Sequence, residues 1–275
     1  KMLTIYQKEL DPYSQKLTPS ALDFLNAAAK SNIDYIMPFL VLSLLLDFLP
    51  NGKSITNRII QIRTIFLEFC QKHLSSQPEK MILLLKHIFV RSSDRVAIKE
   101  NSAYCIHYLM CTLEDQLPVI AFILTAAQSQ KAAFRSLALD IFTLLINDED
   151  SHLSDDIEMQ MLEIMKIGIK DSIPSVRSSS INSITSLISK ADQRIIDAIV
   201  NDDDNELLLI IESRIRDEKL NVRKATLKLL QALGYISDDP IKVIFPLIAE
   251  RTRDRSVTMR QEAANILTKF MTELS

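Results

Sequence analysis

The chain has 275 residues, of which 47% are hydrophobic and 24% charged, with three glycines and no tryptophan. This length can bury a large core, whereas three glycines are too few for a dinucleotide-binding turn and the tight turns of a sheet. The net charge of −3 excludes a chain that is basic throughout, so any nucleic-acid surface must be a local patch. The composition therefore predicts an all-α protein.

Helical patterns follow one another through the first half of the chain. We expect an extended lead-in over residues 1–16, because Asp11-Pro12 breaks an early helix, and a helix start at Thr18-Pro19. The most apolar run, 35–49, is too short to span a bilayer, so a buried helix is predicted there. Predicted helices in this half lie at about 18–31, 33–49, 54–74, 79–91, 95–112, 115–128 and 131–147.

Two acidic loops, 147–156 and 201–205, interrupt the second half. Gly168 and Gly234, like Gly52 earlier, lie near predicted helix ends, where a left-handed C-cap conformation suits glycine. No linker is long enough to separate two domains, so we expect one continuous array over residues 1–275, a piece of a longer protein. The predicted helices are 154–169 with Ser154 as its cap, 173–190, 192–200, 206–216, 219–235, 240–252 and 256–274.

The last third contains the same short motif twice. Asp217-Glu-Lys-Leu-Asn-Val-Arg223 and Asp254-Arg-Ser-Val-Thr-Met-Arg260 each place an acidic residue six positions before an arginine that opens a helical pattern. Tandem two-helix units of this length are typical of HEAT or armadillo repeats, so the sequence predicts a HEAT-repeat α-solenoid, a superhelical array of about six to seven antiparallel helix pairs. The basic residues of the register, separated by 36, 36, 42, 46 and 37 positions, are Arg63, Lys99, Arg135, Arg177, Arg223 and Arg260.

The recurring acidic–arginine pairs allow two interpretations. They can bond between neighbouring repeats as a structural ladder, or the arginines can bind phosphate. A repeated position is best explained by a repeated structural role, so the ladder is favoured. Its predicted members are Asp171, Arg177, Asp217, Arg223, Asp254 and Arg260.

Basic residues outside this register are the better candidates for contact with DNA. They lie on one predicted helix and around the following turn, where the alternative interpretation is a solvated surface. The candidates are Lys219, Lys224, Lys228, Arg251, Arg253 and Arg255.

The chain lacks the common signatures of catalysis and metal binding. No nucleophile elbow, phosphate-binding lysine loop or zinc-protease helix is present, so no enzyme and no cofactor are expected. Cys105, His107 and Cys111, with His87 nearby, match no metal-binding spacing, and no metal site is expected. Together with Cys70, the two cysteines are interpreted as reduced core thiols on helices of an intracellular protein.

Four segments, in this order, resemble a known family: Ser129-Gln-Lys-Ala-Ala-Phe-Arg135, Lys170-Asp-Ser-Ile-Pro-Ser-Val-Arg177 and the two motifs of the last third. Over about 125–275 the chain resembles the HEAT-repeat array of the D-type condensin subunits, and most of all the condensin II form. Residues 1–120 match only as generic helical repeats. Residues 178–180, all serine, depart from the family pattern.

The resemblance implies a non-catalytic regulatory scaffold of condensin II in the nucleus, on chromosomes. Such a subunit binds a kleisin chain, approaches the SMC ATPase heads, and helps the complex engage DNA or chromatin during mitotic condensation. Neither a membrane nor a small-molecule substrate is expected as a partner.

Two other functions compete with this one. A HEAT adaptor of another class, such as a nuclear transport receptor or a phosphatase scaffold, would bind a small GTPase or a catalytic subunit. A nucleic-acid binder working alone would bind DNA with strong salt dependence.

Overall fold

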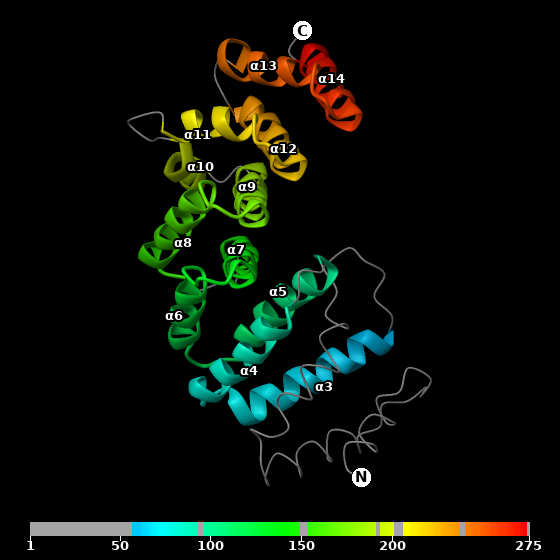
Figure 1. Ribbon diagram of the computed structural model, residues 1–275. Helices are drawn as coiled ribbons and strands as arrows, with labels where there is room; N and C mark the ends of the chain where they lie inside the picture. The colour runs from blue at the N-terminus through cyan, green and yellow to red at the C-terminus, as the bar shows by residue number, and fades with distance from the viewer. Residues whose placement is uncertain are drawn as a thin grey trace. The chain divides into compact units, whose positions relative to one another are not determined.

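The computed structural model describes residues 57–92, 96–148, 153–190, 193–200, 206–236 and 240–273, and all regular structure in these ranges is α-helical (Figure 1). The predicted helices at 18–31 and 33–49, and Gly52, lie outside the described residues. Within the described residues, no helix combines the length and the apolar character that crossing a membrane requires. The chain forms two compact units, Lys1–Leu144 and Leu145–Ser275.

The first unit is built around α4. Its described helices are α3 (Asn57–Leu74), α4 (Pro78–Arg91), α5 (Val96–Met110), α6 (Leu117–Ala126) and most of α7 (Ala132–Ile146). Helix α4 packs against α3, α5 and α6. Phe89 of α4 is fully buried and meets Phe122 and Phe134 edge-on, with ring centroids 5.5 and 5.3 Å apart. This aromatic cluster gives α4, α6 and α7 a shared core.

The second unit repeats a two-helix module. Its helices are α8 (Asp155–Gly168), α9 (Pro174–Ser189), α10 (Gln193–Val200), α11 (Glu206–Arg214), α12 (Leu220–Ile236), α13 (Pro240–Arg251) and α14 (Val257–Glu273). The second helices of the modules are neighbours, because α12 contacts both α9 and α14, while α8, α11 and α13 each contact their own partner. The short helix α10 packs on α8 and α9, and its insertion explains why one repeat spacing reaches 46 residues.

Serines occupy part of the core stripe of α9. Ser179, Ser180 and Ser183 are all buried, and the Ser180 hydroxyl donates to the main-chain carbonyl of Met165 in α8. Because helix separation depends on the side chains at the contact, these small residues suit the extensive packing of α9 on α12. Ser154 stands at the N-cap of α8 in an extended conformation, but its side chain makes no capping hydrogen bond.

The glycines play a different part from the left-handed caps that the sequence predicted. Helix α8 ends at Gly168 and is followed by Ile169 in a right-handed conformation, with φ −63° and ψ −27°. Gly234 lies within the last turn of α12, where a Cβ atom would stand 2.5 Å from Cζ of Phe270. The absence of a side chain at Gly234 is therefore needed for the close approach of the Phe270 ring.

Candidate functional site: an arginine–aspartate ladder beside an arginine-lined cavity

The turn inside each module of the second unit is closed by its aspartate. The Oδ1 atom accepts a hydrogen bond from the backbone N–H two residues later, which satisfies a donor that the following helix leaves unpaired. The distances are 2.8 Å at Asp171, 2.9 Å at Asp217 and 2.9 Å at Asp254.

The arginine six residues later folds back onto the same turn. Its Nη1 atom donates to the carbonyl oxygens of the acidic residue and of the next residue. The distance to the first carbonyl is 2.9 Å for Arg177, 2.9 Å for Arg223 and 2.8 Å for Arg260. In the first unit, Arg135 makes the same contact with Ser129, at 2.8 Å. One arm of each guanidinium group is thus held by its own turn, and the other N–H groups point away from that contact.

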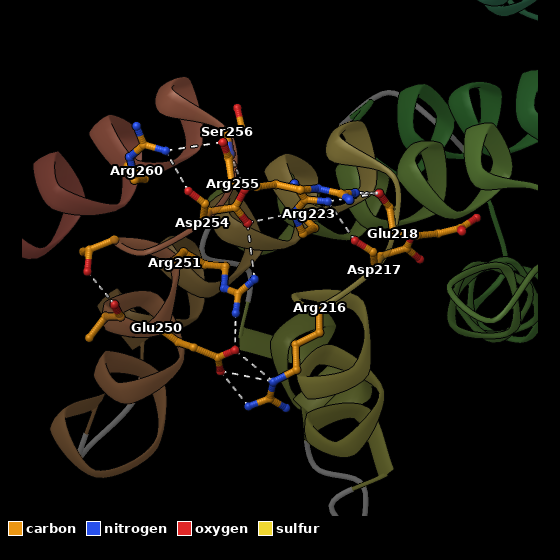
Figure 2. Close-up of polar contacts among 12 residues, drawn as sticks. Arg216, Asp217, Glu218, Arg223, Glu250, Arg251, Asp254, Arg255, Ser256 and Arg260 are labelled. Carbon is orange, nitrogen blue, oxygen red and sulfur yellow. Dashed lines mark hydrogen bonds and ion pairs between the residues drawn. The ribbon is translucent and has the colours of Figure 1, made fainter.

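The other arms of two arginines reach the aspartate of the next module. Arg177 Nη2 lies 3.0 and 2.9 Å from Oδ1 and Oδ2 of Asp217. Arg223 binds Asp254 with two separate arms, Nε to Oδ2 at 2.9 Å and Nη2 to Oδ1 at 2.9 Å. All four side chains are at most 8% exposed. Each of these two arginines therefore joins the carbonyls of one turn to the carboxylate of the next, and this set of contacts is called the ladder below. Figure 2 shows Arg223 between Asp217 and Asp254.

A second arginine supports each buried carboxylate and is counted with the ladder. Arg214 Nη1 lies 3.1 Å from Oδ2 of Asp217, and Arg251 Nη1 lies 3.3 Å from Oδ2 of Asp254. Burial raises the pKa of both carboxyl groups, but hydrogen bonds from the ladder arginine and a backbone N–H, with the charges of two arginines, outweigh burial. The pKa of Asp217 and that of Asp254 therefore lie below the ordinary value, and both groups are ionised at neutral pH.

These pKa values predict how the second unit responds to acid. Its free energy of unfolding is expected to fall as pH drops below about 4 through the folded-state pKa values, because the unfolded chain binds protons first. The contribution is fully present above that window. Urea unfolding followed by circular dichroism at neutral pH and at about pH 3 measures it. Asp254→Asn should reduce the loss, whereas Asp156→Asn, at an exposed position, should not; equal losses in the wild type and Asp254→Asn would contradict the prediction.

The first unit uses the register differently. Lys99 of α5 stands where later modules have arginine, and its Nζ lies 2.7 Å from Oγ of Ser136 and 2.8 Å from Oδ2 of Asp140, both on α7. The acidic position of that next module is occupied by Ser129, which carries no charge. The lysine therefore finds its carboxylate within the helix rather than in the turn. The side chain of Arg63 lies outside the described residues.

A cavity of about 300 Å³ opens beside the ladder, between the turns that precede α12 and α14. Buried or half-buried ladder groups line it: Asp217, Arg223, Arg251 and Asp254. Its exposed lining comes from Arg216, Glu218, Arg253 and Arg255.

An exposed ion pair stands at the edge of this cavity. Arg216 Nε and Nη2 bind the Glu250 carboxylate at distances from 2.7 to 3.1 Å, and Arg251 also bonds to Glu250 (Figure 2). The hydrogen bond from Arg216 lowers the pKa of Glu250 and, with the two arginine charges, outweighs its partial burial. The sequence reasoning missed Arg214, Arg216 and Glu250. The sequence holds a signal for Arg214, because Arg214 and Arg251 each stand three residues before a ladder aspartate.

The structure separates the six basic residues proposed to contact DNA. Arg251 has a side chain only 12% exposed and belongs to the ladder, so its geometry is that of a structural residue. Lys219 lies in the turn before α12, 54% exposed, and pairs loosely with Glu218 at 3.6 Å. Lys228, Arg253 and Arg255 are also exposed, and Lys224 is half-buried.

The thiols of the first unit divide into two kinds. Cys70 and Cys105 are buried and Cys111 is exposed, and none of the three forms a disulfide among the described residues. Burial, with the neighbouring Cys105, raises the pKa of the Cys70 thiol well above its usual value. Cys70 and Cys105 are thus core residues, whereas Cys111 is exposed, so the prediction of a core thiol was wrong for Cys111.

Comparison with known proteins supports the class of fold. The family described as "HEAT repeat associated with sister chromatid cohesion" matches residues 191–230, the region of α10, α11 and α12 as far as Leu230. No curated protein is detectably similar in sequence. Importin β superposes over 99% of this chain and 34% of its own, with 12% identity and a TM-score of 0.59.

A second solved structure, that of Kap121p, has a similar fold. Kap121p superposes over 98% of this chain and 26% of its own, with 15% identity and a TM-score of 0.57, and Kap121p bound to Nup53p gives 14% and 0.57. The chain thus spans about a third or a quarter of the length of these solenoids. At such identities the likeness shows the fold alone. The fold is an all-α solenoid of HEAT type, and the chain is a HEAT-repeat protein.

Proposed function

We propose that this chain is part of a non-catalytic scaffold subunit of condensin II, which binds the kleisin subunit near the SMC ATPase heads. The match of residues 191–230 to a HEAT repeat associated with sister chromatid cohesion carries the proposal, because that process also acts on chromosomes. The matched segment includes the 217–223 motif, on which the resemblance to D-type condensin subunits also rests. The proposed location is therefore the nucleus, on mitotic chromosomes.

The architecture suits a scaffold. A solenoid makes most of its contacts between neighbouring modules, so its surface is long for its mass and can hold an extended segment of a partner. In the second unit the ladder arginines are paired with the ladder aspartates, so partner binding would depend on exposed side chains outside the ladder. DNA or chromatin engagement by the complex would draw on the exposed lysines of this unit, Lys219 and Lys228, with Lys224 beside them.

Co-purification with the kleisin tests the proposal. The full chain is mixed with tagged kleisin segments tiled along the condensin II kleisin, and we expect one segment to be retained. The matched control is the same tiling of a cohesin kleisin, from which none should be retained. Retention of neither set by a folded, helical chain would refute the condensin assignment.

A second candidate rests on the solved neighbours. Importin β and Kap121p have the same fold over nearly the whole chain, so an adaptor of the transport-receptor type is the alternative. It predicts nucleotide-dependent binding of a small GTPase and no retention of kleisin. A pull-down with the GTPase loaded with GTP or GDP separates the two functions in one experiment.

A further inference from the structure

Two arginines at the cavity carry charges that the ladder does not use. The guanidinium group of Arg253 has no hydrogen-bond or ion-pair partner among the described residues, although its backbone N–H donates to the carbonyl of Glu250, and the Arg255 side chain donates to the main-chain carbonyl of Glu218 but to no carboxylate there. Every other arginine that lines the cavity is paired: Arg223 with Asp254, Arg251 with Asp254 and Glu250, and Arg216 with Glu250. The cavity therefore has an excess of positive charge at its exposed side.

Exposed apolar side chains stand at the starts of both helices that follow the cavity turns. Leu220 is the first residue of α12 and is 38% exposed, and Val257 is the first residue of α14 and is 55% exposed. Each follows its ladder aspartate by three residues, so the two are equivalent in the repeat. At each of two successive turns, an exposed apolar residue therefore follows exposed basic residues closely in the sequence.

We propose that the turns 216–220 and 253–257 form a docking site for an extended acidic segment of a partner protein, with one carboxylate in the cavity between Arg253 and Arg255. Guanidinium groups bind carboxylates through two parallel hydrogen bonds, and a volume of about 300 Å³ accommodates one acidic side chain. Apolar residues of the segment on either side of the carboxylate lie against Leu220 and Val257. The inference rests on the proposed function in taking the occupant to be a protein.

Charge around the cavity favours a peptide over nucleic acid. Glu218 lines the cavity and is 76% exposed, and Glu250, 39% exposed, pairs with the lining residue Arg216; both carboxylates would repel a continuous line of phosphates. A sugar–phosphate backbone also makes no use of the apolar pair, whereas a peptide can place its acidic and apolar residues to match. A peptide therefore satisfies both observations.

Fluorescence anisotropy of the full chain with a labelled peptide tests the proposal. The peptide has two adjacent glutamates flanked by leucines, and its matched control has glutamines in their place. We expect the glutamate peptide to bind and the glutamine peptide to bind at least about tenfold more weakly, since each charge-assisted contact is stronger than a neutral one. No binding of the glutamate peptide at concentrations up to about 1 mM would overturn the proposal.

Two pairs of substitutions locate the site. Arg253→Glu with Arg255→Glu should weaken the peptide by about tenfold or more, whereas Lys224→Glu with Lys228→Glu changes net charge equally and should alter binding by less than about twofold. Equal losses in both would show a general charge effect and overturn the assignment. Arg253→Gln with Arg255→Gln repeats the test without introducing new charge.

The apolar part has its own comparison. Leu220→Ser with Val257→Ser should weaken the peptide, and Leu209→Ser with Val243→Ser, at exposed apolar positions on α11 and α13, should not. If Leu209→Ser with Val243→Ser weakens peptide binding more than Leu220→Ser with Val257→Ser does, the apolar contact lies elsewhere and this part of the site is refuted. If the wild type binds duplex DNA but not the glutamate peptide, and Arg253→Glu with Arg255→Glu abolishes DNA binding, these arginines contact nucleic acid and the proposal is overturned.

The same variants separate this inference from the proposed function. If a kleisin segment is retained equally by the wild type and by the Arg253→Glu, Arg255→Glu variant, the scaffold function stands and this docking site is wrong. If the acidic peptide binds and no kleisin segment does, the site stands and the condensin assignment is wrong.

Discussion

Arg223→Ala is expected to lower the free energy of unfolding of the second unit by about 3–5 kcal/mol, which is the usual cost of removing one partner from a buried ion pair. The substitution leaves the Asp254 carboxylate, 2% exposed, with Arg251 at 3.3 Å as its remaining arginine. It also removes the donor that serves the carbonyl oxygens of Asp217 and Glu218 at 2.9 and 3.1 Å. The buried charge of Asp254 and the lost hydrogen bond to the Asp217 carbonyl both disfavour the folded state, whereas the Glu218 carbonyl keeps its hydrogen bond from Arg255.

Urea unfolding at neutral pH measures the effect through the midpoint and its slope. Because modules of a solenoid are stabilised mainly by their neighbours, amide hydrogen exchange should also quicken in α12 and α14 before it does in α8. The control is Arg216→Ala, which breaks an exposed pair with Glu250 and should cost about 0–1 kcal/mol. Equal small effects of the two substitutions would show that the ladder contributes little to stability.

Phe270→Ala is expected to cost about 3–5 kcal/mol, as large-to-small changes of buried aromatic residues do. The Phe270 side chain is 1% exposed and its ring packs on Phe245 and Tyr235, with centroids 5.1 and 5.0 Å away. Its tip also occupies the space that a side chain at Gly234 would need. Removing the ring therefore opens a cavity between α12, α13 and α14.

Gly234, which lies against the Phe270 ring, allows a control that distinguishes direct contact from a general loss of core packing. Gly234→Leu alone should destabilise the unit by about 1–3 kcal/mol through overcrowding, although leucine is the better helix former. In the double variant with Phe270→Ala, the leucine can fill the cavity, so the two losses should not add. Thermal or urea unfolding of the three variants measures the coupling. Additive losses would mean that the residues are not in contact.

The ladder changes how the basic residues of this chain are understood. The sequence has enough arginines in this region to suggest an anion-binding surface. The side chains of Arg177, Arg223 and Arg251, however, each donate to a carboxylate or carbonyl of a nearby turn. Their charge is neutralised where they lie, and the buried pairs hold successive modules in register. Binding has to come from the groups outside the ladder, among which Arg253 and Arg255 stand at the cavity.

Much of the secondary structure followed from the sequence. The predicted helices 79–91, 131–147, 173–190 and 240–252 differ from α4, α7, α9 and α13 by at most one residue at each end, because apolar periodicity and helix-starting prolines are local signals. Repetition of the Asp–Arg motif was sufficient to predict tandem helix pairs. It also placed the two ladder residues in equivalent positions of each module.

The tertiary structure decided which groups meet. Arg177 pairs with an aspartate 40 residues later and Arg223 with one 31 residues later, whereas each binds its own turn through main-chain carbonyls. Sequence periodicity shows that positions are equivalent, but the offset between stacked modules depends on how their helices pack. For the same reason, only the packing of α12 against α14 could show that Gly234 makes room for Phe270, that Arg251 belongs to the ladder, and that Arg253 and Arg255 face a shared cavity.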